Sequence, residues 1–465
     1  MDYDVLIIGS GPAGQHAAWQ ASSMGKRAAI IERKPKIGGA GLQTGTIPSK
    51  AMREVAYLVS RSGFGGMRQA LAPDGHTHHG LLADAVRRKE VVIAQQESVI
   101  LQRLMRSGVA LIPGEASFVD THTIQVSDTA GNSRNISADV IVLATGSRPR
   151  RPSHIPFDKK TVLDSTSILN LRHLPNSLLV VGGGVIACEF VSIFAALGVQ
   201  VCVVDIHAQL LTYLSEDVVG VLADSFLGMG VTFHMQERVT EIRREENSTL
   251  TLLESGKQIR TDVVLYAQGR EPNSEKLQVS RAGIIAQDGW IAVNEHFQTS
   301  LPHVYAVGDL IGRPALASTG MEQGRTAVLY AFGGEMHATA DNFPMAIYTI
   351  PEISYVGKTE KEVQQENISY LVGRAYFKDS ARGQIIGDGH GLLKLIVNAR
   401  DEKLLGVHIV GEQASELIHI GQLVMNLNGT VRDLVSNVFN YPTLAECYKL
   451  AALDCVHQLE QQKDS

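Results

Sequence analysis

The sequence predicts an α/β fold with two Rossmann-like units and a C-terminal α+β unit. Strand-like runs alternate with helical patterns through the first two thirds of the 465 residues, which favours parallel sheets. The order strand, glycine-rich turn, helix and strand occurs twice, first from Asp4 to Ile31 and again from Leu178 to Val204. After about Asn342 the pattern changes to strands followed by helices, which indicates a separate unit. Its expected elements span residues 392–397, 404–410, 412–427 and 443–459.

Three other regions have recognisable local patterns. Spaced Val, Ile and Leu among charged residues predict a long helix at about 81–107. Residues 120–139 predict a β-hairpin with its turn at 129–132. Residues 148–156 contain three prolines and no periodicity, which indicates a connector between domains.

Composition and charge argue against nucleic acid and membrane partners. The formal net charge of −6 at pH 7 gives no basic surface for nucleic acid or acidic lipid. Residues 178–204 are apolar and long enough to span a bilayer. However, three consecutive glycines interrupt them and Glu189 would lie near their middle, which is costly in hydrocarbon. A buried strand, turn and helix is therefore the better interpretation.

Cysteine and histidine patterns argue against disulfides and metal sites. The cysteines lie in apolar surroundings without paired metal-ligand spacing, at Cys188, Cys202, Cys447 and Cys455. We expect buried free thiols and a reducing compartment. The N-terminus enters a strand without a signal peptide, so we predict a cytoplasmic protein. The loop at 65–80 carries His76, His78 and His79 without acidic or cysteine partners, so no metal site is predicted.

The first glycine-rich turn has the spacing of a dinucleotide-binding fingerprint. Gly9, Gly11 and Gly14 follow a strand and open a helix, and Glu32 ends the next strand. Glycines let a helix N-terminus approach a pyrophosphate, whose charge the backbone N–H groups and the helix dipole stabilise. A carboxylate at the end of the second strand can bind the ribose hydroxyls.

The second turn repeats this pattern with Gly182, Gly184 and Ala187, and Asp205 ends its second strand. Two such units in one chain predict two dinucleotides, the usual arrangement when a flavin and a nicotinamide exchange a hydride. One nucleotide with a degenerate repeat is the alternative. An acid at position 205 favours the free 2′-hydroxyl of NAD over the 2′-phosphate of NADP, unless Arg270 or His207 helps to bind the phosphate.

A third signal connects the first site with the flavin. Residues 299–309 form an apolar strand that ends in Gly-Asp, so Asp309 would face the ribitol and phosphates of the first dinucleotide. Thr145 and Gly146 close another strand at the same sheet edge. The chain should therefore return to its first unit after the second one.

Three further motifs carry a family resemblance. They are Gly-Thr-Ile-Pro-Ser-Lys-Ala-Met-Arg at 45–53, Tyr-Thr-Ile-Pro-Glu-Ile-Ser at 348–354 and Asn-Tyr-Pro-Thr-x-Ala-Glu at 440–446. With the two fingerprints, they resemble motifs of the pyridine nucleotide-disulphide oxidoreductases along nearly the whole chain. Within that family the sequence is most similar to the soluble pyridine nucleotide transhydrogenases.

The resemblance implies a glutathione-reductase-like arrangement, non-covalent FAD, a nicotinamide dinucleotide and a homodimer formed through the C-terminal domain. The implied domains are FAD-binding (1–148 and, after the return, 271–341), NAD(P)-binding (149–270) and dimerisation (342–465). The implied FAD site comprises Gly9, Gly11, Gly14, Glu32, Arg33, Gly39, Thr46, Lys50, Ala116, Thr145, Gly146, Asp309 and Ala317. The implied NAD(P) site comprises Gly182, Gly184, Ala187, Glu189, Asp205, Gly269 and Arg270.

The resemblance also implies a catalytic pair. In the family, the lysine of Ile-Pro-Ser-Lys pairs with the glutamate of the second fingerprint helix beside flavin N5. Here these residues are Lys50 and Glu189. A cation at that position stabilises negative charge on the reduced flavin, and the acid keeps the lysine charged and oriented. A plain ion pair is the alternative interpretation.

The sequence departs from the family where sulfur chemistry would occur. Gly41 and Thr46 stand at the two cysteine positions of the redox-active loop, and a dithiol relay needs two sulfurs. Tyr441 stands where the disulfide reductases carry the histidine that acts as thiol base, although the acid that orients it is kept as Glu446. Tyr441 either shapes a substrate pocket at the dimer interface or only packs there.

We therefore expect FAD-dependent hydride transfer between nicotinamide dinucleotides without a redox-active disulfide, with NAD(H) as substrate and NADP(H) as a second candidate. The alternative is an NAD(P)H dehydrogenase that reduces a quinone or another small non-thiol acceptor. A flavin-containing redox sensor is a third interpretation, which no partner motif in the sequence supports.

Overall fold

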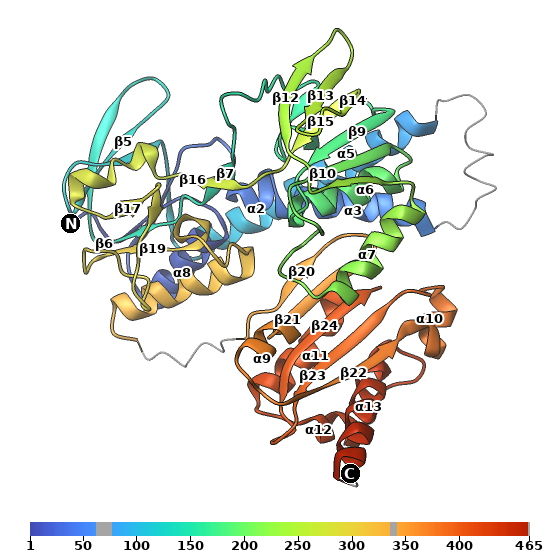
Figure 1. The fold of residues 1–465 in the computed structure, drawn as a ribbon. Coiled ribbons are helices and arrows are strands. Elements are labelled where there is room, and N and C mark those ends of the chain that lie inside the picture. Colours follow the sequence, from blue (N-terminus) through green and yellow to red (C-terminus); the bar gives the residue numbers. More distant parts are fainter. Residues whose placement is uncertain (62–76, 335–341, 464–465) are drawn as a thin grey trace.

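The computed structural model describes residues 1–61, 77–334 and 342–463. Figure 1 shows three bodies: the first unit with the N-terminus, the second unit beside it, and the C-terminal unit below the second. The expected loop at 65–80 falls mostly outside these ranges, as do the side chains of its histidines. Among the described residues, no group of three or more His, Cys, Asp or Glu side chains could hold a metal ion.

The first unit is built on a seven-stranded sheet with the order β3-β2-β1-β6-β5-β4, and β19 pairs with β6. Its parallel strands are β1 (Tyr3–Ile8), β2 (Ala28–Glu32), β3 (Ala110–Pro113), β6 (Ser133–Leu143) and β19 (Val304–Ala306). Helices α1 (Pro12–Ser23) and α8 (Ala317–Ala331) pack against each other, and alanines of α1 with Ala327 and Val328 of α8 share one buried cluster with the sheet. Because β19 joins this sheet, the chain does return to the first unit after the second.

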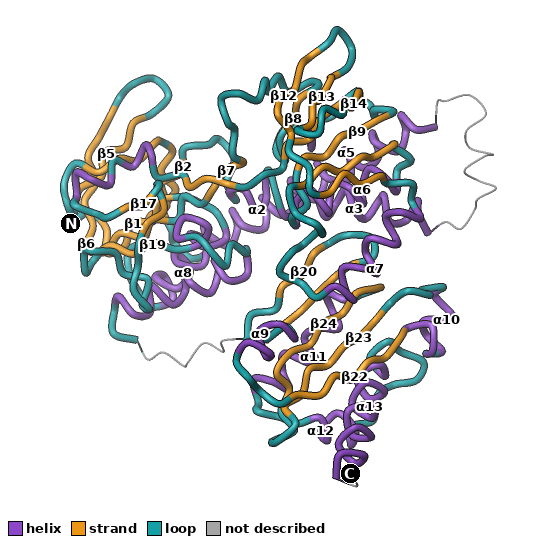
Figure 2. Tube along the Cα trace, in the orientation of Figure 1, coloured by secondary structure: helices purple, strands orange, loops and turns teal. Residues whose placement is uncertain are grey.

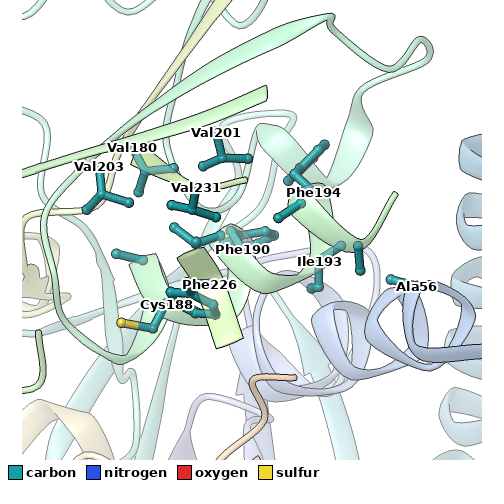
Figure 3. Packing of buried hydrophobic residues seen from close by; sticks show 14 of the residues in the cluster. Ala56, Val180, Cys188, Phe190, Ile193, Phe194, Val201, Val203, Phe226 and Val231 are labelled. Atoms are coloured by element: carbon teal, nitrogen blue, oxygen red, sulfur yellow. The ribbon is translucent and has the colours of Figure 1, made fainter. Parts of the chain in front are cut away.

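The second unit holds a five-stranded parallel sheet with the order β11-β10-β9-β15-β8. Its strands are β8 (Val162–Leu163), β9 (Ser177–Val181), β10 (Gln200–Asp205), β11 (Thr232–Met235) and β15 (Val263–Tyr266). Helix α6 (Val185–Ala196) packs between this sheet and α3 (Thr46–Arg61) of the first unit. Figure 3 shows Phe190 of α6 against valines of the strands, and Ile193 facing Ala56 of α3.

The C-terminal unit has a five-stranded antiparallel sheet, β20-β21-β24-β23-β22, with helices packed on it. The strands are β20 (Met345–Ile347), β21 (Glu352–Gly357), β22 (Tyr370–Tyr376), β23 (Leu392–Asn398) and β24 (Leu404–Gly411). The main helices are α11 (Ala414–Asn426), α12 (Val431–Ser436) and α13 (Glu446–Lys463). Figure 2 shows strands and helices segregated in this unit, as an α+β unit requires.

Most expected elements occur, with shifted ends. The long helix is α5 (Thr77–Arg106), and the hairpin is formed by β5 (Thr123–Ser127) and β6. The apolar stretch 178–204 forms β9, α6 and β10, and no described helix is both long and apolar enough to cross a membrane.

The connector at 148–156 is not wholly irregular, which corrects the expectation. Its start lies in β7 (Ser147–Pro149), which pairs antiparallel with β16 (Arg270–Pro272). The outgoing and returning chains therefore bond to each other between the first two units. The sequence could not predict the pairing of β7 with β16, because a three-residue strand that contains proline shows no alternating pattern.

Candidate active site

The first fingerprint forms a tight turn that exposes the N-terminus of α1. Gly9 has φ +109°, and a Cβ at Gly14 would lie 2.0 Å from the Gly9 carbonyl oxygen, so only glycine fits at position 14. Gly11 is the N-cap residue of α1 and contributes no side-chain cap. The first N–H groups of the helix are thus left for an anion, as a pyrophosphate site requires.

Glu32, at the end of β2, is held against this turn. Its Oε2 accepts hydrogen bonds from Ser10 N (3.0 Å) and Ser10 Oγ (2.6 Å), and its Oε1 accepts one from Lys34 N at 2.9 Å. The Ser10 Oγ in turn accepts from Gly38 N at 3.0 Å. Sequence reasoning missed Ser10, although its place between two fingerprint glycines was a usable signal.

Other predicted FAD residues lie around this turn or on its sheet. A Cβ at Gly39 would lie 2.7 Å from Gly11 Cα, so these two glycines allow two backbones to approach closely. Arg33 is half-exposed and forms an ion pair with Glu115 at 3.5 Å. Ala116 is buried on β4 (Glu115–Phe118), and Ala317 begins α8 after an N-cap without a side-chain bond.

The edge formed by Thr145, Gly146 and Asp309 contains polar atoms that lack partners. Thr145 Oγ1 and Asn273 Oδ1 are buried, and neither atom forms a hydrogen bond with another described residue. Asn273 Nδ2 donates to Thr145 O at 2.9 Å, so the two side chains are neighbours. Buried polar atoms of this kind normally have partners. Together with the exposed helix N-terminus, they fit a polar cofactor such as FAD at this site.

Arg270, which the resemblance assigned to the NAD(P) site, lies at this edge too. Its Nε donates to Ser147 Oγ at 2.7 Å and its Nη2 donates to Ser147 O at 2.9 Å. The Ser147 hydroxyl donates to Asp309 Oδ2 at 2.6 Å, and Arg270 Nε is 3.7 Å from the same carboxylate oxygen. Pairing of β7 with β16 brings Arg270 here, which the sequence alone could not show.

The second fingerprint reproduces the geometry of the first. Gly182 has φ +117°, Gly184 caps α6 without a side-chain bond, and Ala187 is buried in the third position. Asp205 is buried at the end of β10, and its Oδ2 accepts from Gly183 N at 2.5 Å. Gly269, with φ +93° and open space around it, follows β15 near the same sheet edge.

The other oxygen of Asp205 is bonded to His207. Asp205 Oδ1 accepts from His207 N at 2.8 Å and lies 2.6 Å from the ring Nδ1. The His207 side chain is 56% exposed. A nucleotide's adenosine end would thus meet one carboxylate and one imidazole here.

Helices α3 and α6, which carry Lys50 and Glu189, lie side by side where the first and second units join (Figure 1). The Lys50 Nζ lies 2.7 and 2.6 Å from the two carboxylate oxygens of Glu189, and Glu189 Oε1 also accepts from Tyr348 N at 3.0 Å. Lys50 lies on α3 and Glu189 on α6, so one ion pair joins the helix of the Ile-Pro-Ser-Lys motif to the helix of the second fingerprint. The predicted pairing of these residues is present.

The two positions where the family's redox loop carries cysteines hold glycine and threonine here. Gly41 lies in α2 (Gly39–Gln43) and Thr46 is the exposed first residue of α3. The four cysteines are all free, and burial raises the pKa of each thiol, to about 11 for Cys447 and about 12 for Cys455. Thiols with raised pKa values are poor nucleophiles at neutral pH.

Tyr441 and Glu446 lie apart from Lys50 and Glu189 within one chain. The Tyr441 side chain is 74% exposed, and Glu446 begins α13 in the C-terminal unit. No hydrogen bond or ion pair of the described residues connects either with the Lys50–Glu189 pair. If they act in catalysis, they must do so in a site that a second chain completes.

Two family models together cover most of the chain. Residues 3–324 match the pyridine nucleotide-disulphide oxidoreductase family, and residues 343–452 match the dimerisation domain of that family. The chain belongs to this family. It is therefore an oxidoreductase, and membership implies FAD and a nicotinamide dinucleotide. The sequence-based fold class and family resemblance are confirmed.

Curated relatives match almost end to end. Soluble pyridine nucleotide transhydrogenases of Mycobacterium tuberculosis, Vibrio parahaemolyticus and Azotobacter vinelandii are 45%, 40% and 39% identical to the chain. Each alignment covers 98% of this chain and 98–99% of the relative.

Solved structures show the same fold. LpdA from Mycobacterium tuberculosis aligns over 97% of this chain and 98% of its own, at 27% identity and a TM-score of 0.88. The HOCl-induced flavoprotein disulfide reductase RclA from Escherichia coli aligns over 97% and 99%, at 26% identity and a TM-score of 0.86.

Proposed function

We propose that the protein transfers hydride between nicotinamide dinucleotides by means of FAD and without a redox-active disulfide. The observation that carries this proposal is the Lys50–Glu189 ion pair, which joins the two fingerprint units, together with Gly41 and Thr46 at the two cysteine positions of the redox loop. The transhydrogenase names of relatives at 39–45% identity support it.

The residues of the chain have distinct tasks in this proposal. The N-termini of α1 and α6 bind the two pyrophosphates, and Glu32 and Asp205 bind ribose hydroxyls. Bound FAD would supply a ring that accepts a hydride from one nicotinamide and gives it to another. Lys50 places a positive charge at the reacting edge of the flavin, where it stabilises negative charge. Glu189 holds Lys50 in place and favours its charged form.

A direct assay tests the proposal. The purified protein is mixed with NADPH and thio-NAD, and formation of reduced thio-NAD is followed by absorbance. We expect turnover that iodoacetamide does not inhibit, because no thiol takes part. Lys50→Met should keep FAD bound and slow flavin reduction by NADH. Absence of reaction above a control without enzyme, or full loss of activity on alkylation, would contradict the proposal.

A second candidate function is supported by Asp205. Asp205 ends β10, and an acid at this position of a dinucleotide fingerprint favours a free 2′-hydroxyl and would repel a 2′-phosphate. The protein would then oxidise NADH and reduce a quinone or another small acceptor. Anaerobic reduction with NADH, followed by reoxidation timed against NADP, NAD, a quinone and dioxygen, separates the two. A quinone rate far above both nicotinamide rates selects the second candidate.

We also propose a cytoplasmic homodimer. The match to the dimerisation domain supports it, as do exposed apolar side chains of the C-terminal unit, including Val438 and Tyr441. Sedimentation equilibrium should give twice the chain mass. Val438→Glu should shift that mass towards the monomer, and a wild-type monomer would exclude the proposal.

A further inference from the structure

Polar side chains in a row on one face of helix α3 contact the C-terminal unit. Lys50, Arg53, Tyr57 and Arg61 follow one another at steps of three or four residues, which places them on one helix face. Tyr57 donates to Glu412 Oε1, and Arg61 donates to Glu412 Oε2 and to a backbone carbonyl at residue 386. The row begins at the Lys50–Glu189 pair and continues as the contact with the C-terminal unit.

Arg53 is the buried member of this row. Its side chain is only 9% exposed. Nε and Nη2 donate to Thr349 O at 3.3 and 3.2 Å, and Nη1 lies 3.2 Å from Glu352 Oε1. The other oxygen of Glu352 accepts from Ser415 N at 3.1 Å and from Ser415 Oγ at 2.8 Å. Arg53 thus fixes the backbone at residue 349 while its own charge is paired.

The backbone that Arg53 fixes is the one that bonds to Glu189. Thr349 follows Tyr348, whose N–H donates to Glu189 Oε1 at 3.0 Å. The Tyr348 ring centroid is 4.9 Å from Lys50 Nζ. No hydrogen bond or ion pair of the described residues joins Arg53 to either member of the pair, but the backbone of Tyr348 and Thr349 connects it to Glu189. Arg53 and Tyr348, two motif residues without an assigned role, are thus linked in the structure.

We propose that Arg53 and Glu352 are positioning residues for the Lys50–Glu189 pair. They hold residues 348 and 349 so that the Tyr348 N–H fixes Glu189, and Glu189 then fixes the charge of Lys50 relative to the flavin. This inference rests on the proposed function only for the role of Lys50 beside the flavin.

Arg61 offers a matched control. It lies on the same helix face and bonds to the same C-terminal unit, but its side chain is 37% exposed and its partners have no bond to Glu189. A variant at Arg61 weakens the contact between α3 and the C-terminal unit without changing the path through Tyr348. An effect shared by the Arg53 and Arg61 variants would therefore come from a weaker contact between α3 and the C-terminal unit, and not from a displaced Glu189.

The test uses the FAD-loaded protein and two measurements. The midpoint potential of bound FAD is measured against a reference dye without any nicotinamide, and the rate of flavin reduction by NADH is measured by stopped flow. Arg53→Met should make the potential more negative and slow reduction by about tenfold, the loss expected when a hydrogen bond to a charged group is weakened. The NADH concentration at half-saturation should stay unchanged. Arg53→Lys should restore part of the rate, and Arg61→Met should change neither quantity.

A double-mutant cycle with Glu189→Gln shows whether Arg53 acts through Glu189. If it does, Arg53→Met adds little to the potential shift once Glu189 is replaced. Additive shifts, an unchanged potential in Arg53→Met, or an equal effect of Arg61→Met would each overturn the proposal. If Arg53→Met does not fold, Glu352→Gln decides in its place. Its crystal structure should show a Tyr348 N–Glu189 Oε1 distance longer than 3.0 Å, and an unchanged distance would overturn the proposal.

The same data separate this inference from the proposed function. A wild-type enzyme that fails to reduce thio-NAD, with a shifted potential in Arg53→Met, would refute the proposed function and leave the positioning role standing. Normal transhydrogenation with an unshifted potential in Arg53→Met would refute the positioning role alone.

Discussion

The two fingerprint sites share one local design. Each begins with a glycine at positive φ, +109° at Gly9 and +117° at Gly182. In each, the acid at the end of the second strand accepts the N–H of the residue after that glycine, Ser10 in the first and Gly183 in the second. The two turns therefore have the same local structure.

Their surroundings differ. The first turn is enclosed by segments from distant parts of the chain: a Cβ at Gly39 would meet Gly11 at 2.7 Å, and one at Gly324 would meet Ala13 O at 2.1 Å. At the second turn, a Cβ at Gly184 or Gly269 would meet nothing within 4 Å, although one at Gly182 would lie 2.9 Å from Ala267 O. We expect a resident cofactor in the first site and an exchanging nucleotide in the second.

Ligand removal should give the largest contrast between the two sites. A resident FAD at a thousand times its dissociation constant contributes about 4 kcal/mol to the free energy of unfolding, whereas NAD at ten times its constant contributes about 1.4 kcal/mol. Urea denaturation of the protein with FAD, without FAD and with added NAD measures both. Equal effects of the two ligands would refute the distinction.

Substitution at the third fingerprint position should cost more in the first site than in the second. A Cβ at Gly14 would lie 2.0 Å from a backbone oxygen, so Gly14→Ala should cost about 3 kcal/mol and reduce the FAD content. The second site already holds Ala187 there, and Ala187→Gly should cost only about 1 kcal/mol through helix propensity. Absorbance of bound flavin and denaturation curves measure these effects. Full FAD content in Gly14→Ala would show that the first turn is not tight.

The acids should control different nucleotides. Replacing Asp205 with Ser and Ile206 with Arg removes a negative charge and adds a phosphate-binding cation, so the preference for NADPH over NADH should rise by about tenfold or more. Glu32→Gln, the matched change in the first site, should lower FAD affinity and leave the nicotinamide preference as it was. Ratios of kcat/KM for the two reduced nucleotides provide the measurement. An unchanged ratio would place selectivity outside β10.

The sequence could predict features that motifs describe but not the other contacts between the units. Both turns and both acids follow from local motifs with fixed spacing, the return of 299–309 follows from its Gly-Asp ending, and the Lys50–Glu189 pair follows from the family resemblance. Contacts between units that no motif describes were not accessible from the sequence. The resemblance placed Arg270 in the NAD(P) site, and only the structure shows the β7–β16 pairing that brings it near Asp309. Arg53 and Tyr348 were quoted as motif residues without a role, because the bond path to Glu189 crosses three units.

The second unit also rests on the C-terminal sheet, through a buried ionic contact that should make the protein acid-sensitive. Lys394 of β23 is fully buried, lies 2.7 Å from Asp217 of α7 (Glu216–Gly228) and also pairs with Glu360. His408 on the adjacent strand β24 is fully buried, and its Nε2 lies 3.1 Å from Lys358 O. Burial lowers the pKa of His408, and Lys394 lowers it further, although Lys358 O, Asp217 and Glu360 act in the opposite direction.

The smallest predicted effect is the pH dependence that His408 causes. Below the unfolded imidazole pKa of about 6.5, the unfolded chain binds a proton that the folded chain does not, so the free energy of unfolding should fall by at most about 1.4 kcal/mol per pH unit from this residue. His408→Gln keeps a donor for Lys358 O but cannot be protonated, so its stability should fall less between pH 7 and pH 5. Urea denaturation across that range compares the two proteins. Parallel curves would mean that His408 can be protonated in the folded protein without loss of stability. Water would then reach the contact between Lys394, Asp217 and Glu360 more readily than its burial indicates.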